Sequence, residues 1–158
     1  MLLKESQIKQ LIKIGSISIE PFDVEFQLHG SYINLRLSDR FYRYPEDLRP
    51  EVQILDPENP YFNILERDYI SDKGIVLEPG RFYIFETLEY ISIPENISIF
   101  LQPKLRLSRL GINLLNSGWI GYGYEGNLTL CVHNVNAYPV RIFKDMSIVH
   151  IFLSKSEL

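Results

Sequence analysis

The sequence has a single cysteine, no long apolar run and no excess of basic residues, which argues against a secreted, membrane-spanning or nucleic-acid-binding protein. Its single cysteine, Cys131, cannot form an internal disulfide, which agrees with a reducing compartment. No apolar run approaches the roughly 20 residues of a membrane span. The N-terminus "MLLKESQIKQ" lacks the apolar core of a secretory signal, so a cytoplasmic protein is expected. A formal charge of −4 argues against broad nucleic-acid binding, although a local patch could hold a small anion.

What the chain does contain is enough apolar material for one compact domain. It has 158 residues, of which 46% are hydrophobic and 23% charged, and a chain of this length buries a core without disulfides. We expect residues 1–158 to form a single domain. Residues 45–74 carry four prolines and many acidic side chains without a sustained period, which predicts a surface excursion.

The hydrophobic period predicts one helix followed by many strands. Ile8, Leu11 and Ile12 recur at helical spacing, and Gly15 is placed to end that helix. After it the period is two, in segments rich in β-branched and aromatic residues and cut by Pro-Gly and Gly-Tyr-Gly turns. These segments are "SISIEPF", "SYINLRLSDRFYRY", "VLEPGRFYIFETLEYISI", "ISIFLQPKLR", "NLTLCVHN" and "YPVRIF…SIVHIFLSK". The pattern predicts an all-β sandwich or barrel with a short N-terminal helix.

Five blocks resemble dCTP deaminases in order and spacing. "LHGSYINLRLSDRF" resembles their first strand block, and "VLEPGRFYIFETLEYISIPENI" is similar to "PGEFVLASTLEYVELPDDL". "PKLRLSRLG" stands where the family has "GRSSLARLG", "GWIGYGYEGNLTL" where it has "GWIDAGFKGKITLE", and "IFKDMSIVHIFLSK" where it has "PGMRIGQLIFSK". The resemblance implies the distorted β-jelly-roll, or β-clip, of the dUTPase-like proteins, a homotrimer, and active sites between subunits.

The resemblance also implies a chemistry for which this chain lacks two carboxylates. The family deaminates dCTP to dUTP, hydrolyses the diphosphate of dUTP, or does both, and each reaction needs a carboxylate that activates water. The deaminating glutamate of "ITLE" falls on Cys131, and the aspartate of "WID" falls on Gly121. The glutamine of "IGQL" falls on His150. In the phosphate-binding "GRSS", the arginine becomes Lys104, which lacks the planar fork of arginine, and the serines become Leu105 and Arg106.

Other family features are retained. Arg109 matches the second arginine of "GRSSLAR", and with Lys104 and Arg106 it forms an anion-binding patch if the three share a face. Trp119 and Tyr124 match the aromatics of the glycine-rich hairpin, where they could form a sugar platform. We therefore take these five residues and His150 as candidates for nucleotide or phosphate binding. Deamination of this kind requires no cofactor, and Mg²⁺ would enter only with a bound triphosphate.

Each candidate also has a simpler interpretation. Alternation places Leu128, Leu130 and Val132 on one face of a strand and Thr129, Cys131 and His133 on the other. Cys131 is more commonly a small buried thiol than a nucleophile, even with His133 two residues on. Cys131, His133 and His150 could be proposed as a metal site, but they lack paired spacing and a fourth ligand. The three cations could be a solvated face or a subunit contact. Glu125 is expected to face solvent, His29 to be a turn residue, and the Gly-aromatic loop to be a tight hairpin rather than a phosphate loop, since no helix follows it.

Three classes of function follow from these observations. One is an active dCTP deaminase or dUTP diphosphatase, and the second is a non-catalytic relative that binds dCTP, dUTP or another anion, or regulates a partner. The third is a jelly-roll with an unrelated site, for which the Cys131/His133 pair is the one indication. The missing carboxylates favour impaired catalysis on the family scaffold.

Overall fold

The fold is described by a computed structural model, which covers residues 1–47, 54–58, 64–116 and 118–156. Within these residues the chain forms three short helices and twelve strands. The helices are α1 (Glu5–Lys13), α2 (Val24–Gln27) and α3 (Leu105–Ser108). The strands are β1 (Ser18–Glu20), β2 (Leu28–His29), β3 (Tyr32–Arg43), β4 (Glu66–Tyr69), β5 (Ile75–Leu77), β6 (Phe82–Ser92), β7 (Ile97–Pro103), β8 (Ile112–Leu114), β9 (Trp119–Ile120), β10 (Glu125–Asn134), β11 (Val140–Ile142) and β12 (Ser147–Lys155).

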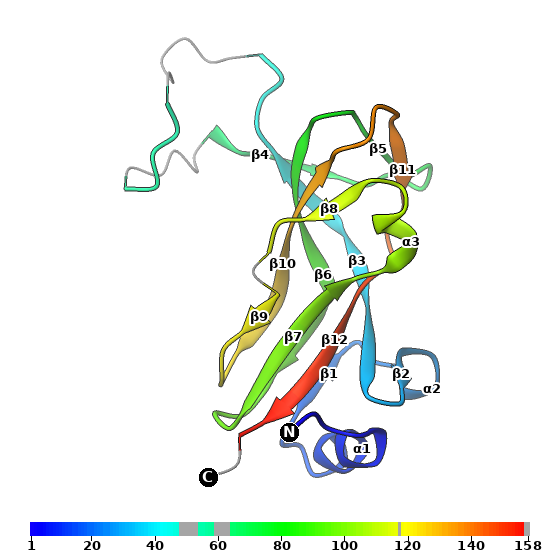
Figure 1. Cartoon of the computed structure of the whole chain (residues 1–158), viewed down its shortest axis with the longest axis vertical. Coiled ribbons are helices and arrows are strands. Elements are labelled where there is room, and N and C mark those ends of the chain that lie inside the picture. The colour runs from blue at the N-terminus through cyan, green and yellow to red at the C-terminus, as the bar shows by residue number, and fades with distance from the viewer. Residues whose placement is uncertain (48–53, 59–63, 117, 157–158) are drawn as a thin grey trace.

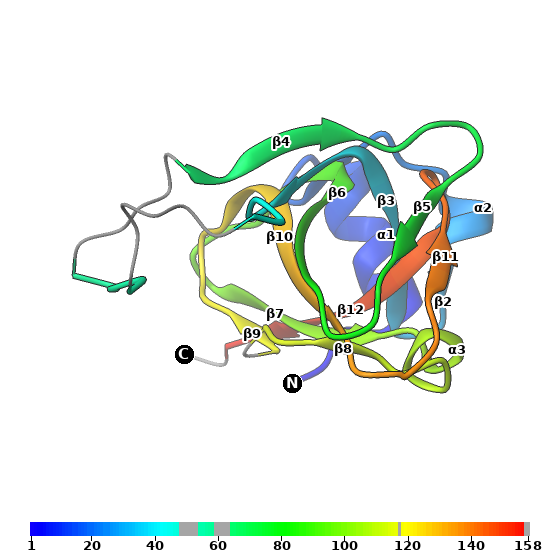
Figure 2. The same ribbon diagram turned by 90° about the horizontal axis from the view of Figure 1, so that it is seen from above.

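Most strands belong to one antiparallel sheet that curls around the core. Its main path runs β8-β10-β6-β3-β12-β7-β9, while β1, β2 and β4 pair with strands inside that path and β5 pairs with β11. Figure 1 shows the long strands crossing the molecule, and Figure 2, a view from above, shows the sheet curling round. The predicted mainly-β class with a short N-terminal helix is confirmed.

The core lies on the concave face of this sheet because the long strands alternate. In β3, Ile33, Leu35 and Leu37 are fully buried, and the residues between them are partly exposed. In β10, Leu128, Leu130 and Val132 are buried while Thr129, Cys131 and His133 face outward, as the alternation predicted. The sheet therefore has a buried inner face and an outer face whose side chains are partly exposed.

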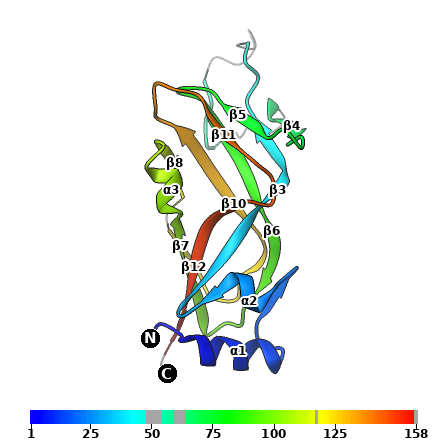
Figure 3. The same cartoon turned by 90° about the vertical axis from the view of Figure 1, so that its right-hand side faces the viewer.

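Helix α1 covers the end of the sheet at which both chain ends lie (Figure 3). Ile8 is its buried residue, and Gly15 follows the helix with a φ of 74°, a conformation that favours glycine. The N-terminal amine of Met1 donates to the carbonyl of Lys155, which ties the start of the chain to β12. No helix in the described part of the chain has the length and apolarity needed to cross a membrane.

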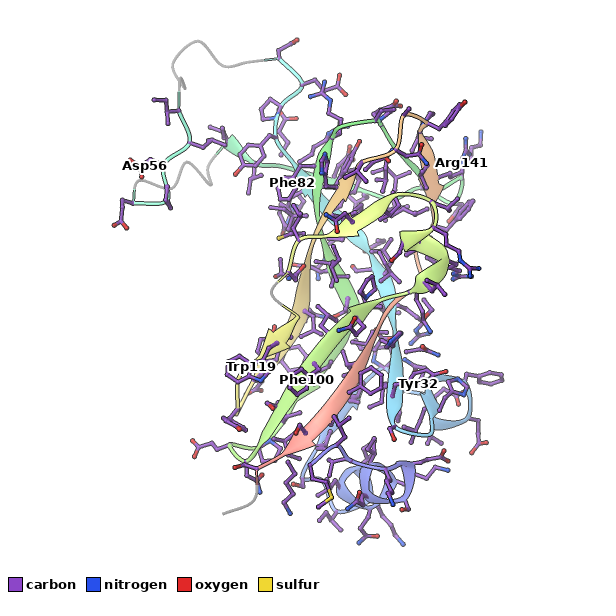
Figure 4. The ribbon with its side chains drawn as sticks, viewed as in Figure 1. Tyr32, Asp56, Phe82, Phe100, Trp119 and Arg141 are labelled. Carbon is purple, nitrogen blue, oxygen red and sulfur yellow. The ribbon has the colours of Figure 1, made fainter. Side chains whose placement is uncertain are left out.

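One local prediction was wrong, and one segment contains a strand that was not expected. Residues 104–106 were assigned to a strand, but β7 ends at Pro103 and the chain turns into α3. A proline lacks the N–H that would continue the β-ladder, which is consistent with this end. Within residues 45–74, where only an excursion was expected, β4 pairs with β3 along its four residues. Its "ERDY" sequence is almost entirely polar because it is an edge strand exposed to water. The described residues 54–58 do lie away from the sheet and are exposed, as Asp56 in Figure 4 shows, and residues 48–53 and 59–63 lie outside the described part.

Candidate functional site

Lys104 and Arg106 lie where α3 begins, against the outer face of β3 and β12. The ammonium of Lys104 donates to the side-chain oxygen of Asn34 and lies 5.6 Å from the centre of the Tyr32 ring. The guanidinium of Arg106 donates to the backbone carbonyl of Ser147 at 3.1 Å. Burial, with the nearby charge of Arg106, lowers the pKa of Lys104. Two of the three cations of the predicted anion patch therefore lie near each other at the start of α3.

His150 and Ser147 add unpartnered polar atoms to this spot. The register of β12 against β3 shifts between Ser147 and Val149, so Ile148 and Val149 are both buried and Ser147 and His150 share the outer side. The His150 ring packs 5.2 Å from Tyr32 between ring centres. Its Nδ1 atom and the Ser147 hydroxyl are buried with no hydrogen-bond partner among the described residues. Buried polar atoms without partners are uncommon, and these two lie close to the cations Arg106 and Lys104.

His150 should make stability depend on pH. Burial and, secondarily, the charge of Lys104 lower the pKa of His150 in the folded protein. The unfolded chain therefore takes up this proton at a higher pH than the folded chain does. The free energy of unfolding should fall as the pH drops below the ordinary histidine pKa of about 6.5 and level off below the lowered folded-state pKa.

Urea unfolding of wild type and His150→Gln at pH 8 and pH 5.5 checks this expectation. The substitution should reduce the loss of stability at the lower pH, because glutamine does not titrate. His29→Gln is the matched control, since His29 lies exposed at the end of β2 with its Nε2 3.0 Å from the carbonyl of Phe26. An equal acid sensitivity in wild type and His150→Gln would contradict the role assigned to His150.

The Gly-aromatic segment, residues 118–126, is not the tight hairpin that was predicted. β9 pairs with β7, placing Trp119 opposite Phe100, while β10 pairs with β6 and β8. The segment thus links two parts of the curled sheet, and its backbone is tied to the β6–β7 turn by hydrogen bonds from Ile93 N to Tyr124 O and from Gly123 N to Pro94 O. Figure 4 shows Trp119 and Phe100 close together at this end of the molecule. A local sequence pattern predicts a turn but not which strands pair on either side of it.

The two aromatic candidates of this segment differ in their surroundings. Trp119 is 51% exposed and meets the Tyr122 ring edge-on, with 6.4 Å between ring centres. Tyr124 packs against the core, and its hydroxyl donates to the carbonyl of Asn127 at 2.7 Å. Burial, followed by the charge of Glu86, raises the pKa of Tyr124. Of the two, Trp119 is the more exposed ring and can stack on a ligand, while Tyr124 fixes the shape of the segment.

Neither position that the resemblance assigns to a carboxylate carries an acid. Cys131 is half-buried on the outer face of β10 opposite Ile84, and burial raises the pKa of its thiol, which is therefore neutral at neutral pH. Gly121 does not have a left-handed backbone, and a Cβ there would meet only the Trp119 ring, at 3.7 Å. Glu125 is exposed, as expected, and accepts a hydrogen bond from the Tyr90 hydroxyl at 3.1 Å.

A carboxylate that the sequence analysis did not single out lies one strand away. Glu86 of β6 pairs with Thr129, so it is a diagonal neighbour of Cys131 on the outer face. Its side chain is 25% exposed, and one oxygen lies 3.3 Å from the guanidinium of Arg40. The sequence comparison could have found this residue, because the family block "FVLASTLEYV" has serine where this chain has Glu86.

Within one chain the candidates form two separate groups. Lys104, Arg106 and His150 gather at α3, and Figures 1 and 2 show α3 and β9, which carries Trp119, on opposite sides of the molecule. Arg109 follows α3 at its C-terminal end and is exposed. In the described residues, no three histidine, cysteine, aspartate or glutamate side chains gather closely enough to hold a metal ion, so Cys131, His133 and His150 do not form the metal group considered above.

Comparison with known proteins shows the family to which the chain belongs. The family model described as "dCTP deaminase-like" matches residues 2–156. The dUMP-forming dCTP deaminase of a Sulfurihydrogenibium species is 35% identical over 158 residues, which span 99% of this chain and 85% of that protein. That of Nanoarchaeum equitans is 34% identical over 169 residues, with 97% and 83% covered. The crystal structure of the Agrobacterium tumefaciens dCTP deaminase has the same fold, with a TM-score of 0.76 and 23% identity over 98% of this chain and 48% of that one. The chain belongs to the dCTP deaminase-like family.

Proposed function

We propose that this protein binds a pyrimidine deoxynucleoside triphosphate in the family pocket while its deamination of dCTP and its hydrolysis of dUTP are absent or severely reduced. The observation that carries the proposal is the pair of positions 121 and 131, which hold a glycine and a neutral thiol in place of carboxylates. Removing a general base typically costs about 10²–10⁴ in rate. The loss of two such groups from one site reduces turnover at least that far.

Binding is supported by the group of side chains at α3. Lys104 and Arg106 supply positive charge, and the unpartnered atoms of Ser147 and His150 lie beside them. A triphosphate is the polyanion that the relatives named dCTP deaminase take as part of their substrate. Mg²⁺ would accompany it as a counterion of the phosphates rather than as a resident metal.

A homotrimer completes this proposal. The α3 group and the Gly-aromatic segment lie on opposite sides of one chain (Figure 1), and the resemblance implies sites between subunits, so we expect one nucleotide to use these groups from neighbouring copies. In a trimer of the kind that the resemblance implies, α3 of one copy meets the segment of a neighbour. Sedimentation of the pure protein measures this directly: a monomer would mean that the two groups never form one site.

Turnover is tested by incubating the pure protein with dCTP and with dUTP, with Mg²⁺ present, and measuring ammonia and pyrophosphate. We expect rates at least about 10²-fold below those of the Sulfurihydrogenibium relative assayed alongside as positive control. Release of either product at a rate similar to that of the relative would overturn the proposed impairment.

Binding is tested by thermal denaturation with and without deoxynucleoside triphosphates. A ligand that binds only the folded state must raise the melting temperature. Replacing Lys104 by glutamine should reduce this rise, because it removes one of the cations at α3 that are proposed to bind the phosphates. A rise without turnover is the result that the proposal expects, and it is the behaviour of a non-catalytic nucleotide-binding or regulatory trimer. No rise with any nucleotide at millimolar concentration would show that the pocket has been lost.

A further inference from the structure

Glu86 places a carboxylate on the face where the family's chemistry takes place. It lies in the middle of β6, directly opposite Thr129 and diagonal to Cys131. On a sheet, diagonal neighbours on one face are about 7–8 Å apart at Cα, within reach of a long side chain. Glu86 and the short, uncharged Cys131 therefore lie on the same outer face of neighbouring strands.

The surroundings of Glu86 hold it on that face. Arg40 of β3 contacts its Oε2 oxygen at 3.3 Å, and in the described part of the chain no hydrogen bond is formed to the other oxygen, Oε1. The partly buried ring of Tyr124 lies near enough for the charge of Glu86 to raise its pKa. One oxygen is thus anchored to Arg40, and the other is available to accept a hydrogen bond from a ligand on this face.

The position of Cys131 indicates which part of a bound base would face Glu86. The glutamate that the family has at this position could deaminate cytosine only if it lay beside C4, the carbon that carries the exocyclic amine. A base bound over this face therefore presents its 4-position to the Cys131 and Glu86 pair. Cytosine offers an N–H donor at that position, whereas uracil and thymine offer a carbonyl acceptor, which a carboxylate repels.

We propose that Glu86 makes the pocket select a base with a 4-amino group, so that the protein binds dCTP in preference to dUTP. The free carboxylate oxygen accepts a hydrogen bond from the cytosine amine, a contact that the family block, with serine at this position, does not provide. Glu86 acts here as a specificity residue for binding. The inference rests on the proposed function, because it requires that the nucleotide pocket is kept.

The test is calorimetric titration of wild type, Glu86→Ser and Glu86→Gln with dCTP and with dUTP in the presence of Mg²⁺. Wild type should bind dCTP roughly tenfold or more tightly than dUTP, the discrimination expected of one good base contact. Both substitutions should bring the two affinities to within about threefold of each other. Serine is too short to reach the base, and an amide can donate to uracil as readily as it accepts from cytosine.

Asp68→Asn is the matched comparison, since it removes the same charge from a carboxylate of β4 that also lies close to an arginine of β3, Arg43, at 3.4 Å. It should leave the preference for dCTP unchanged. Equal affinities of wild type for the two nucleotides, or a preference that survives in Glu86→Ser or is lost in Asp68→Asn, would overturn the role of Glu86 and leave the proposed function standing. Failure of both nucleotides to bind would overturn both.

Discussion

Replacing Glu89 by alanine should reduce the free energy of unfolding by about 3–5 kcal/mol, the usual cost of removing one member of a buried ion pair. The Glu89 side chain is 0% exposed and lies on the core side of β6. Its Oε1 atom accepts from the Arg36 guanidinium at 2.7 Å and from the Gln27 amide at 2.9 Å, and its Oε2 atom accepts from the Arg36 backbone N–H at 2.9 Å. Alanine would leave these donors without their acceptor and open a cavity. Urea unfolding followed by circular dichroism measures the difference.

The same pair of strands offers a matched control on its other face. Glu86 also pairs with an arginine of β3, Arg40, but both side chains are partly exposed, and such pairs contribute about 0–1 kcal/mol. Glu86→Ala should therefore change stability by less than about 1 kcal/mol. Glu89→Gln preserves the volume and is the variant to use if Glu89→Ala does not fold. Similar small losses for the variants at both positions would contradict a structural role for the buried carboxylate.

Elements with a strong hydrophobic period were predictable from the sequence. The helix around Ile8 and the long strands β3, β6, β10 and β12 lie where the periods of 3.6 and two place them. Elements that form only because a neighbouring strand of the same sheet pairs with them were not predictable from the sequence. The polar strand β4 exists because β3 offers it an edge, and α3 begins where Pro103 ends β7. The strand pairing of β9 with β7 depends on the curl of the whole sheet, which no local pattern contains.

The candidate site was predictable only along continuous segments. Matching residue by residue assigned Gly121 and Cys131 to the family's carboxylate positions because both lie in one block. Glu86 escaped notice because it lies in another block and becomes a neighbour of Cys131 only through the register of β6 against β10. For the same reason the sequence did not reveal that His150 and Ser147 share a side of β12, since this follows from the register shift.

Restoring the two lost carboxylates should restore catalysis, and the extent should depend on Glu86. Gly121→Asp fits because the added Cβ has room beside the Trp119 ring, and Cys131→Glu fits because the thiol faces outward on β10. In the double variant, however, the glutamate introduced in place of Cys131 would be a diagonal neighbour of Glu86 on the same face. Two carboxylates this close disfavour each other's ionised form, which shifts the pKa of the restored base. Adding Glu86→Ser returns the residue of the family block and removes this repulsion.

We therefore expect the triple variant Glu86→Ser, Gly121→Asp, Cys131→Glu to release ammonia from dCTP at least about 10²-fold faster than wild type, the contribution of one positioned general base. The double variant that retains Glu86 should be slower than the triple variant at neutral pH. Repulsion between its two neighbouring carboxylates favours protonation of one of them, and a protonated glutamate cannot act as the general base. Ammonia release across a pH series, with each variant shown to be folded by circular dichroism, separates these effects. If the triple variant folds, binds dCTP and remains inert, the impairment does not lie in the carboxylates. The phosphate-binding group around Lys104 and Arg106, which has replaced the family's "GRSS", would then be the part of the site that fails to position the substrate.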